Sequence, residues 1–329
     1  MTTAAIPPAV VERLRCPRCG GPVTGEGRLV CVDGHEVPQR EGYLDCSSEP
    51  RDAATSSTFA SFGYEWTRFD KVQPEDERFF RGYFTEVDLP SVRGAVGLDA
   101  GCGKGRFSRF MAGHLEAIVA LDGSDAVTAA VRNLGDIPNA CVVRADLRRA
   151  PFHEGSFGFV SCLGVLHHLT DPEEGFHAVV RMLAPGGTLL TYLYSRPTRV
   201  GVRSVSLQAA TLLRRLTTRL PHTVTRLMSA PIAATLYAGV VLPGSLGERQ
   251  GNRFLAGLPL AVYRGSPVRA LWLDTFDRLS APVETRYVWE DVRPWFERAG
   301  LDVQSVAERG GLVIVARRPG HPAAVPSPG

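Results

Sequence analysis

Short apolar runs alternate with amphipathic stretches from the middle of the chain to its C-terminal end. The runs are apolar on both faces, which is typical of strands in a parallel sheet covered by helices on each side. One helix is expected from Asp171, where a capping residue precedes proline and acids, to about Leu183, and another from about Trp289 to Ala299. The expected strands are Val96–Ala100, Ala117–Leu121, Ala140–Val143, Phe157–Leu163, Thr188–Tyr194, Val303–Val306 and Leu312–Ala316.

The alternation breaks for about 80 residues after Tyr194. Within this break, the apolar positions 209, 212, 213, 216 and 220 share one face of an amphipathic helix expected over 208–220. The apolar run Met228–Pro243 contains Pro231 and is too short to cross a bilayer, which needs roughly 20 residues. We therefore expect a buried or lid segment there, and no membrane span.

The pattern predicts an α/β fold whose sheet domain is split by a mainly helical insertion. Residues 51–57 are small and polar and are expected to form a linker. The last residues are rich in proline and are expected to be disordered. The predicted division is 1–50 as a small module, 51–90 as linker and cap segment, 91–195 as the first part of the core, 196–281 as the insertion, 282–318 as the rest of the core and 319–329 as the tail.

The formal net charge of +3 hides an asymmetry along the chain. Residues 196–270 hold eleven arginines and one acid, Glu248, so this stretch carries +10 and the remainder −7. Such a segment suits an anionic partner, either a nucleic acid or an anionic acceptor. The excess of arginine in this stretch also has a neutral explanation. Lys71 and Lys104 are the only lysines, so the whole chain uses arginine wherever it needs a cationic side chain.

The cysteine usage and the N-terminal residues indicate a compartment. Seven cysteines in 329 residues, three of them in or next to the expected strands, do not form the pattern of a disulfide framework. Pro7, Pro8 and Glu12 interrupt the first apolar residues, so no secretory signal is expected. We therefore expect a cytoplasmic protein.

A glycine-rich turn after the first expected strand carries the main chemical signal. Asp99 ends that strand, and Gly101, Gly103 and Gly105 let the backbone approach a ligand closely. The spacing differs from the Gly-x-Gly-x-x-Gly of dinucleotide enzymes, and a carboxylate before the first glycine would repel a diphosphate but suits ammonium and sulfonium groups. Asp122 ends the second strand, where it can accept hydrogen bonds from both hydroxyls of a ribose. Together these features favour S-adenosylmethionine over a nicotinamide dinucleotide.

With this motif and the later segments in the right order, the chain resembles the class I S-adenosylmethionine-dependent methyltransferases over roughly Val96–Tyr194 and Trp289–Arg318. The resemblance implies a Rossmann-like sheet with one antiparallel edge strand, and methyl transfer by in-line displacement. It implies that Asp99, Gly101 and Gly103 hold the methionine end of the cofactor, Asp122 and Gly123 the ribose, Asp146 and Leu147 the adenine, with Leu163 also against the cofactor.

His167 and His168 follow the fourth expected strand, where members of this family place the methyl acceptor. One of them could act as a general base or orient the acceptor. An equally weighted alternative is that one histidine packs beside the cofactor, because in-line transfer depends chiefly on alignment and needs no obligatory base. Tyr64 and Trp66 are candidate lid residues, unless their aromatic segment simply packs on the sheet. Asp277 is a candidate for the acceptor pocket, although a solvated position on the surface would equally explain this acid.

Four potential metal ligands near the N-terminus have the spacing C-x2-C-x11-C-x3-H, in Cys16, Cys19, Cys31 and His35. Three thiolates and an imidazole match tetrahedral zinc, and a module this small needs a stabilising element beyond its core. Cys46 is a competing fourth ligand. A site with four protein ligands has no open position, so we expect a structural zinc ion.

The module and the Glu41–Leu44 segment after it resemble the N-terminal zinc domain of the 23S ribosomal RNA guanine methyltransferases, in which the finger helps to grip RNA. The loop Leu166–Leu169 and the long insertion depart from that pattern and look more like methyltransferases of small molecules, including natural products. Residues 11–46 hold five arginines against six acids, so the module is not basic. Three hypotheses follow: a small-molecule acceptor, anionic or carrier-bound, beneath a lid; RNA gripped by one surface of insertion and module; and a non-catalytic S-adenosylmethionine-binding protein.

Overall fold

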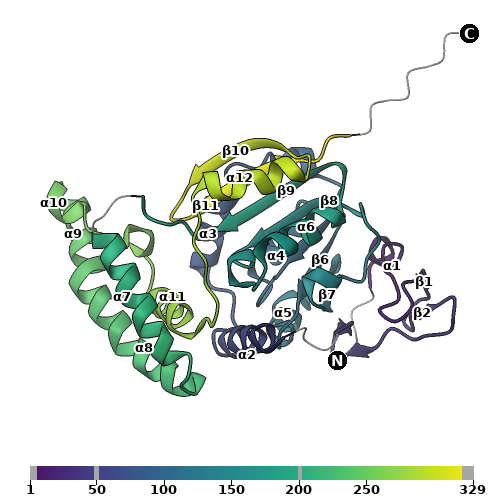
Figure 1. The fold of residues 1–329 in the computed structure, drawn as a ribbon, viewed down its shortest axis with the longest axis horizontal. Coiled ribbons are helices and arrows are strands. Elements are labelled where there is room, and N and C mark those ends of the chain that lie inside the picture. The colour runs from purple at the N-terminus through teal and green to yellow at the C-terminus, as the bar shows by residue number, and fades with distance from the viewer. Residues whose placement is uncertain (1–5, 48–51, 199–201, 321–329) are drawn as a thin grey trace, which may run out of the picture.

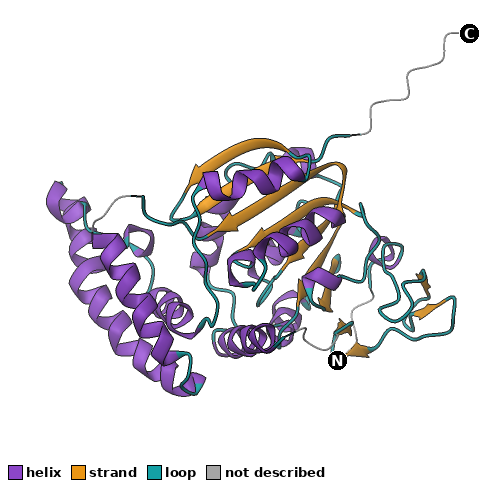
Figure 2. Cartoon of the chain, in the orientation of Figure 1, coloured by secondary structure: helices purple, strands orange, loops and turns teal. Residues whose placement is uncertain are grey.

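The computed structural model describes residues 6–47, 52–198 and 202–320. Residues 321–329 of the predicted tail lie outside these ranges. A nine-stranded sheet runs through the molecule in the order β10-β11-β9-β8-β5-β6-β7-β4-β3 (Figures 1 and 2). The strands of the predicted core are β5 (Val96–Ala100), β6 (Ala117–Asp122), β7 (Ala140–Arg144), β8 (Phe157–Leu163), β9 (Leu183–Leu193), β10 (Asp302–Glu308) and β11 (Leu312–Arg317).

The core strands β9, β8, β5, β6 and β7 are all parallel to one another. Strand β11 is antiparallel to both of its neighbours, β9 and β10. The Rossmann-like fold class is therefore confirmed, with one difference. The antiparallel strand of the core lies one position inside the edge, because β10 adds to its outer side.

Helices cover both faces of the sheet, which explains why its strands are apolar on both sides. On one face, α6 (Pro172–Met182) and α12 (Trp289–Arg298) pack with side chains such as Val119 and Val160. On the other face, α4 (Arg106–Met111) and α5 (Val127–Leu134) cover the alternate positions, among them Ile118 and Ala120. The predicted start of α6 is confirmed, because the Asp171 carboxylate accepts the Glu174 backbone N–H at 2.9 Å.

The N-terminal module is joined to the sheet and is not a separate unit. It contains α1 (Pro8–Val11), β1 (Val23–Thr24), β2 (Val30–Cys31), β3 (Gln39–Arg40) and β4 (Tyr43–Asp45). Strand β4 pairs in parallel with β7 and antiparallel with β3, so the module extends the large sheet by two strands. The sequence did not reveal this pairing, since β4 is short and lies far from β7 along the chain.

The segment expected to be a linker is largely helical. Helix α2 (Ala53–Arg68) begins directly after Asp52, whose carboxylate accepts the Thr55 backbone N–H at 2.7 Å. This side-chain cap explains why small, polar residues start a helix here. Residues 48–51 lie outside the described ranges. Helix α3 (Pro74–Phe84) and the short η1 (Leu89–Val92) complete the segment before β5.

The insertion is helical, as predicted. It comprises α7 (Val202–Thr217), α8 (His222–Leu236), the π-helical turn η4 (Tyr237–Val241), α9 (Leu242–Gln250), α10 (Arg253–Ala256), η5 (Ala261–Tyr263) and α11 (Val268–Ser280). In Figure 1 it lies at the opposite end of the molecule from the N-terminal module.

The apolar run in the insertion differs from the prediction in length and in burial. The turn η4 joins α8 to α9, so His222–Gln250 is a helix of 29 residues, long and apolar enough by composition to cross a membrane. Only 22% of its most apolar window is buried. Of the two expectations for this run, the buried segment is therefore wrong, and the lid segment stays a prediction.

Candidate active site

A cavity of about 1410 Å³ lies where the insertion and helices α2 and α3 meet the carboxyl ends of the core strands. Sites for single small ligands are usually about 300–1,000 Å³. The cavity is therefore large enough for a cofactor and a second molecule. Its position at the carboxyl ends of parallel strands is where open α/β sheets bind ligands.

The glycine-rich turn forms one wall of this cavity. Gly101, Gly103 and Gly105 all have positive φ, of 84°, 54° and 76°, a backbone region that side chains disfavour. A Cβ atom on Gly103 would lie 2.9 Å from the Trp66 Nε1 atom, and one on Gly101 would collide with Val165. The turn therefore needs glycine at these positions, as the sequence predicted.

Asp99 ends β5 within the cavity wall and is almost fully buried. Its two oxygens accept hydrogen bonds from the hydroxyls of Ser108, at 2.6 Å, and Ser161, at 3.0 Å. Burial raises the pKa of the Asp99 carboxyl, and the two serines lower it in part. Contact between this carboxylate and the ammonium of a ligand stays a prediction.

Asp122 ends β6 beside the turn and holds it in place. One carboxylate oxygen accepts the Gly103 backbone N–H at 2.9 Å, and the other accepts the Ser124 N–H at 2.8 Å and hydroxyl at 2.6 Å. Each carboxylate oxygen has two acceptor sites, so Asp122 keeps capacity for a ribose hydroxyl. Gly123 also lines the cavity, and Phe59 from α2 lies so close that a Cβ on Gly123 would collide with its ring.

The remaining predicted cofactor residues also line the cavity. Asp146 and Leu147 stand at η2 (Leu147–Arg149), and Leu163 ends β8. The Asp146 carboxylate is paired with the buried Arg148 guanidinium at 2.7 Å. This pair fixes the corner to which the sequence assigned the adenine, although that assignment itself stays a prediction.

One face of helix α2 closes the cavity with aromatic side chains. Phe59, Phe62 and Trp66 line it, and Trp66 lies against the glycine-rich turn. Tyr64 belongs to another face of the helix, where its hydroxyl donates to Thr223 of α8 at 3.3 Å. Of the two candidate lid residues, only Trp66 is therefore placed at the cavity, and Tyr64 connects α2 to the insertion.

The two candidate catalytic histidines, both in η3 (Leu166–His168), have different surroundings. His167 is fully buried and does not line the cavity; burial lowers its pKa well below the ordinary value, and neither ring nitrogen has a hydrogen-bond partner among the described residues. His168 does line the cavity, and its Nδ1 donates to the Val283 carbonyl at 2.7 Å. A neutral His168 ring therefore has its proton on Nδ1 and leaves Nε2 able to accept a proton.

Two buried carboxyls share the cavity wall with His168. The Tyr194 hydroxyl donates to one oxygen of Asp277 at 2.7 Å, and the other oxygen is buried and unpaired among the described residues. Glu65 of α2 also has a buried unpaired oxygen. Burial raises the pKa of both carboxyls, and for Asp277 the nearby His168 lowers it in part. Unpaired buried oxygens cost free energy unless a ligand supplies a donor.

The sequence singled out Asp277 and His168 but missed Glu65. Phe59, Phe62, Glu65 and Trp66 recur at helical spacing, so a helical interpretation of residues 53–68 would have placed this acid on an aromatic face. An acid in such a position is a recognisable candidate for a ligand contact, because acids are rarely buried without a partner.

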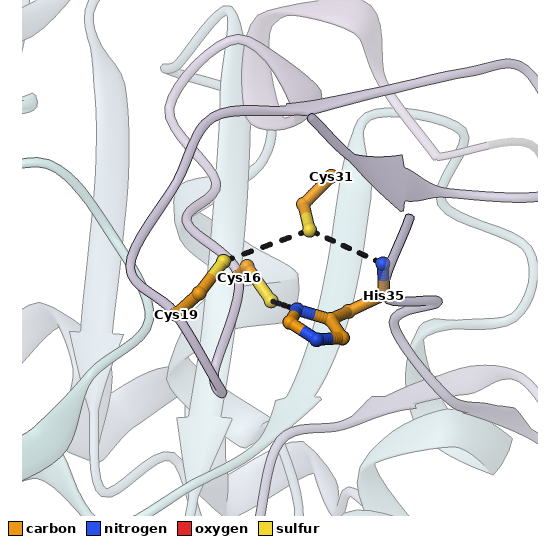
Figure 3. A group of neighbouring side chains, drawn as sticks. All are labelled: Cys16, Cys19, Cys31 and His35. Atoms are coloured by element: carbon orange, nitrogen blue, oxygen red, sulfur yellow. Dashed lines mark hydrogen bonds between the residues drawn. The ribbon is translucent and has the colours of Figure 1, made fainter. Parts of the chain in front are cut away.

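Cys16, Cys19, Cys31 and His35 come together in the N-terminal module, their ligand atoms all within 4.8 Å of one another (Figure 3). The Cys19 and Cys31 sulfurs are 3.6 Å apart, and the Cys16 sulfur is 3.8 Å from His35 Nδ1. Ligands about 2.3 Å from a tetrahedral zinc ion are separated by about 3.8 Å, so the donors and their spacing fit one ion. The competing ligand Cys46 is buried outside this cluster.

Comparisons with known proteins agree with this geometry. Residues 98–191 match the family described as "Methyltransferase domain". An uncharacterized chloroplastic methyltransferase of Arabidopsis thaliana is 32% identical over 162 residues, 43% of this chain and 45% of its own length. A ubiquinone/menaquinone biosynthesis C-methyltransferase of Enterobacter sp. is 32% identical over 120 residues, 34% of this chain and 47% of its own.

Each of these matches covers less than half of the curated relative. Among solved structures, the chain is similar to 1,6-didemethyltoxoflavin-N1-methyltransferase of Burkholderia thailandensis, with 13% identity and a TM-score of 0.48 over 89% of this chain and 96% of that one. The glycine-rich turn, the acids at the ends of β5 and β6, and the family match lie in the same part of the chain. Residues 98–191 are therefore similar to the methyltransferase domain family, and they hold the glycine-rich turn and both of these acids.

Proposed function

We propose that the chain transfers a methyl group from S-adenosylmethionine to a largely apolar small molecule. The observation that carries the proposal is the continuous cavity that joins the glycine-rich turn to His168 and Asp277. One end is lined by the glycine-rich turn and its carboxylates, and the other by His168, Asp277 and Glu65. A cofactor and an acceptor can therefore lie end to end in one cavity.

The residues present fit the cofactor. Positive-φ glycines leave room for close approach, and Asp99 and Asp122 supply negative charge beside the turn. Asp99 and Gly101 would hold the methionine end, Asp122 the ribose, and Asp146 with Leu147 the adenine. Bound there, S-adenosylmethionine supplies an electrophilic methyl group on a positively charged sulfur.

The protein's own contribution is to align the acceptor and to take its proton. Transfer would join the methyl carbon to the acceptor atom and break its bond to sulfur, so an acceptor hydroxyl or amine would also have to lose a proton. His168 lines the cavity and its Nε2 would take this proton, while the carboxyls of Asp277 and Glu65, which line the same cavity, would orient the acceptor. His167 would act only by packing beside Tyr194 and His168.

The walls of the cavity indicate the size and polarity of the acceptor. Helices α7 and α8 contribute Leu213, Ile232 and Leu236, and α2 and α3 contribute phenylalanines. These surfaces suit a large apolar molecule with a few polar groups at its reacting end. A relative named for ubiquinone/menaquinone biosynthesis supports an acceptor of small-molecule class.

The RNA alternative required one basic surface shared by the module and the insertion. The two lie at opposite ends of the molecule (Figure 1). The module also joins the edge of the sheet at β7, whereas the insertion follows β9 on the other side of β5. We therefore favour the small-molecule acceptor and propose that the module, with one structural zinc ion on Cys16, Cys19, Cys31 and His35, stabilises the sheet edge of a cytoplasmic enzyme.

The experiment that tests the proposal is product identification. The full chain is incubated with methyl-labelled S-adenosylmethionine and, separately, with an apolar metabolite extract, a polar extract and total RNA. We expect label in one molecule from the apolar extract, and a much lower yield with Asp277→Asn. Label appearing only in RNA, or in none of the three pools despite tight cofactor binding, would contradict the proposal.

A further inference from the structure

The outer helices of the insertion carry several exposed apolar side chains. Helices α7, α8 and α9 lie at the edge of the molecule, away from the sheet (Figure 1). No charged residue occurs between Arg226 and Glu248. We call the exposed leucines and methionine of these helices the outer apolar face: Leu212, Leu216, Leu227, Met228, Leu242 and Leu246, which are 63%, 62%, 63%, 39%, 51% and 49% exposed. Large apolar side chains exposed in such number on neighbouring helices indicate an interaction site.

The opposite side of the long helix is fixed to the rest of the insertion. Thr225, Ser229 and Ala233 are buried. Trp272 of α11 donates from Nε1 to the Ser229 hydroxyl at 2.9 Å, and the Tyr237 hydroxyl donates to the Ser266 carbonyl at 2.7 Å. A helix crossing a bilayer would have to give up these contacts. The face is therefore suited to lie on a surface and not to span one.

Cations without partners flank the outer apolar face. Arg215 and Arg219 are exposed near one end, and Arg249 and Arg253 near the other; none has an ion-pair partner among the described residues. Glu248, the acid within residues 196–270, is already paired with Arg264 at 2.5 Å. An apolar strip with free positive charge at both ends matches the boundary between acyl chains and anionic headgroups.

We propose that the outer apolar face and its four free arginines dock the protein on an anionic lipid bilayer. A second copy of the chain is a poorer occupant, because a two-fold interface would bring the arginines of one copy towards those of the other. RNA phosphates could form ion pairs with the arginines. They would make no favourable contact with the exposed leucines, which they would also have to cover.

Docking would also place the apolar end of the cavity beside the lipid. Leu213, Ile232, Leu236 and Val240 line the cavity from the inner sides of the helices that carry the outer apolar face. A membrane-dissolved acceptor could then enter from the bilayer between these helices. This last step rests on the proposed methyltransferase function, whereas the docking itself does not.

Vesicle flotation with the full-length protein tests the docking without any cofactor or acceptor. We expect flotation with mixed phosphatidylcholine and phosphatidylglycerol vesicles, little with pure phosphatidylcholine, and a marked loss at high salt because screening weakens the arginine contribution. Arg219→Glu should weaken binding about fivefold or more, and Leu227→Asp about tenfold or more. A labelling assay with the apolar extract tests the acceptor separately, so failure of one proposal can be told from failure of the other.

Matched controls are Arg93→Glu, an exposed arginine before β5, and Val306→Asp, a 40% exposed valine on β10. Both controls should float like the unchanged protein, and all four variants should bind S-adenosylhomocysteine normally. Equal flotation of Leu227→Asp and its control, absence of flotation with anionic vesicles, or a stable dimer that Leu227→Asp dissolves would each overturn the proposal. Preferential binding to RNA that Leu227→Asp leaves intact would do the same.

Discussion

Replacement of Asp122 by alanine tests the geometry of the cofactor site. The carboxylate accepts three hydrogen bonds, from the Gly103 N–H at 2.9 Å and from Ser124 at 2.8 and 2.6 Å, and it faces the proposed ribose position. Loss of a hydrogen bond to a charged group costs about 1.5–3 kcal/mol. We therefore expect the affinity for S-adenosylhomocysteine to fall roughly tenfold to 150-fold.

Isothermal titration calorimetry measures this change directly. Asp125→Ala is the matched control, because it removes the same side chain three residues later from an exposed ion pair with Arg144. The control should bind like the unchanged protein. The affinity of Asp122→Asn should lie between those of the unchanged protein and Asp122→Ala, since one side-chain oxygen remains to accept a hydrogen bond. An unaltered dissociation constant for Asp122→Ala, or an equal loss in Asp125→Ala, would show that the ribose has been placed wrongly.

Three further outcomes are expected from the geometry. Burial raises the pKa of Glu65 above its ordinary value of 4.5, so the folded protein loses stability as pH rises from about 4.5 through the raised pKa. Glu65→Gln should therefore melt at a higher temperature than the unchanged protein at about pH 8, with a free energy of unfolding larger by about 1.4 kcal/mol for each unit by which the pKa is raised. Calorimetric scans showing no pH-dependent difference would refute this. His168→Gln should lower the turnover number about 10²-fold or more while cofactor affinity is kept, whereas unchanged turnover would leave His168 a packing residue. Elemental analysis should find about one zinc ion per chain, lost in Cys31→Ala but kept in Cys46→Ala. Equal zinc content in the two variants would show that the assigned ligands are wrong.

The sequence predicted the core because its signals are local. Strands β5 and β8 have the expected bounds, and Asp171 caps α6 as its neighbours indicate. The turn needs glycine because its backbone has positive φ, and one short motif in the sequence is enough to indicate this. The four metal ligands also follow from short spacings, and the structure brings all of them together.

The features that the sequence did not show depend on contacts between distant segments. The pairing of β4 with β7 joins positions about 100 residues apart, and no local pattern records it. Glu65 and Asp277 reach one cavity from α2 and α11, which periodicity alone cannot bring together. The apolar run of the insertion was expected to be a buried or lid segment, and the sequence did not show its exposed side, because hydrophobicity does not tell what covers an apolar surface.

The most direct test of the central claim is a calorimetric comparison of two ligands with the full-length protein. S-adenosylhomocysteine should bind at one site with measurable heat, and NAD should give none, because Asp99 and Asp122 place negative charge beside the glycine-rich turn. Heat with NAD and none with S-adenosylhomocysteine would contradict the account.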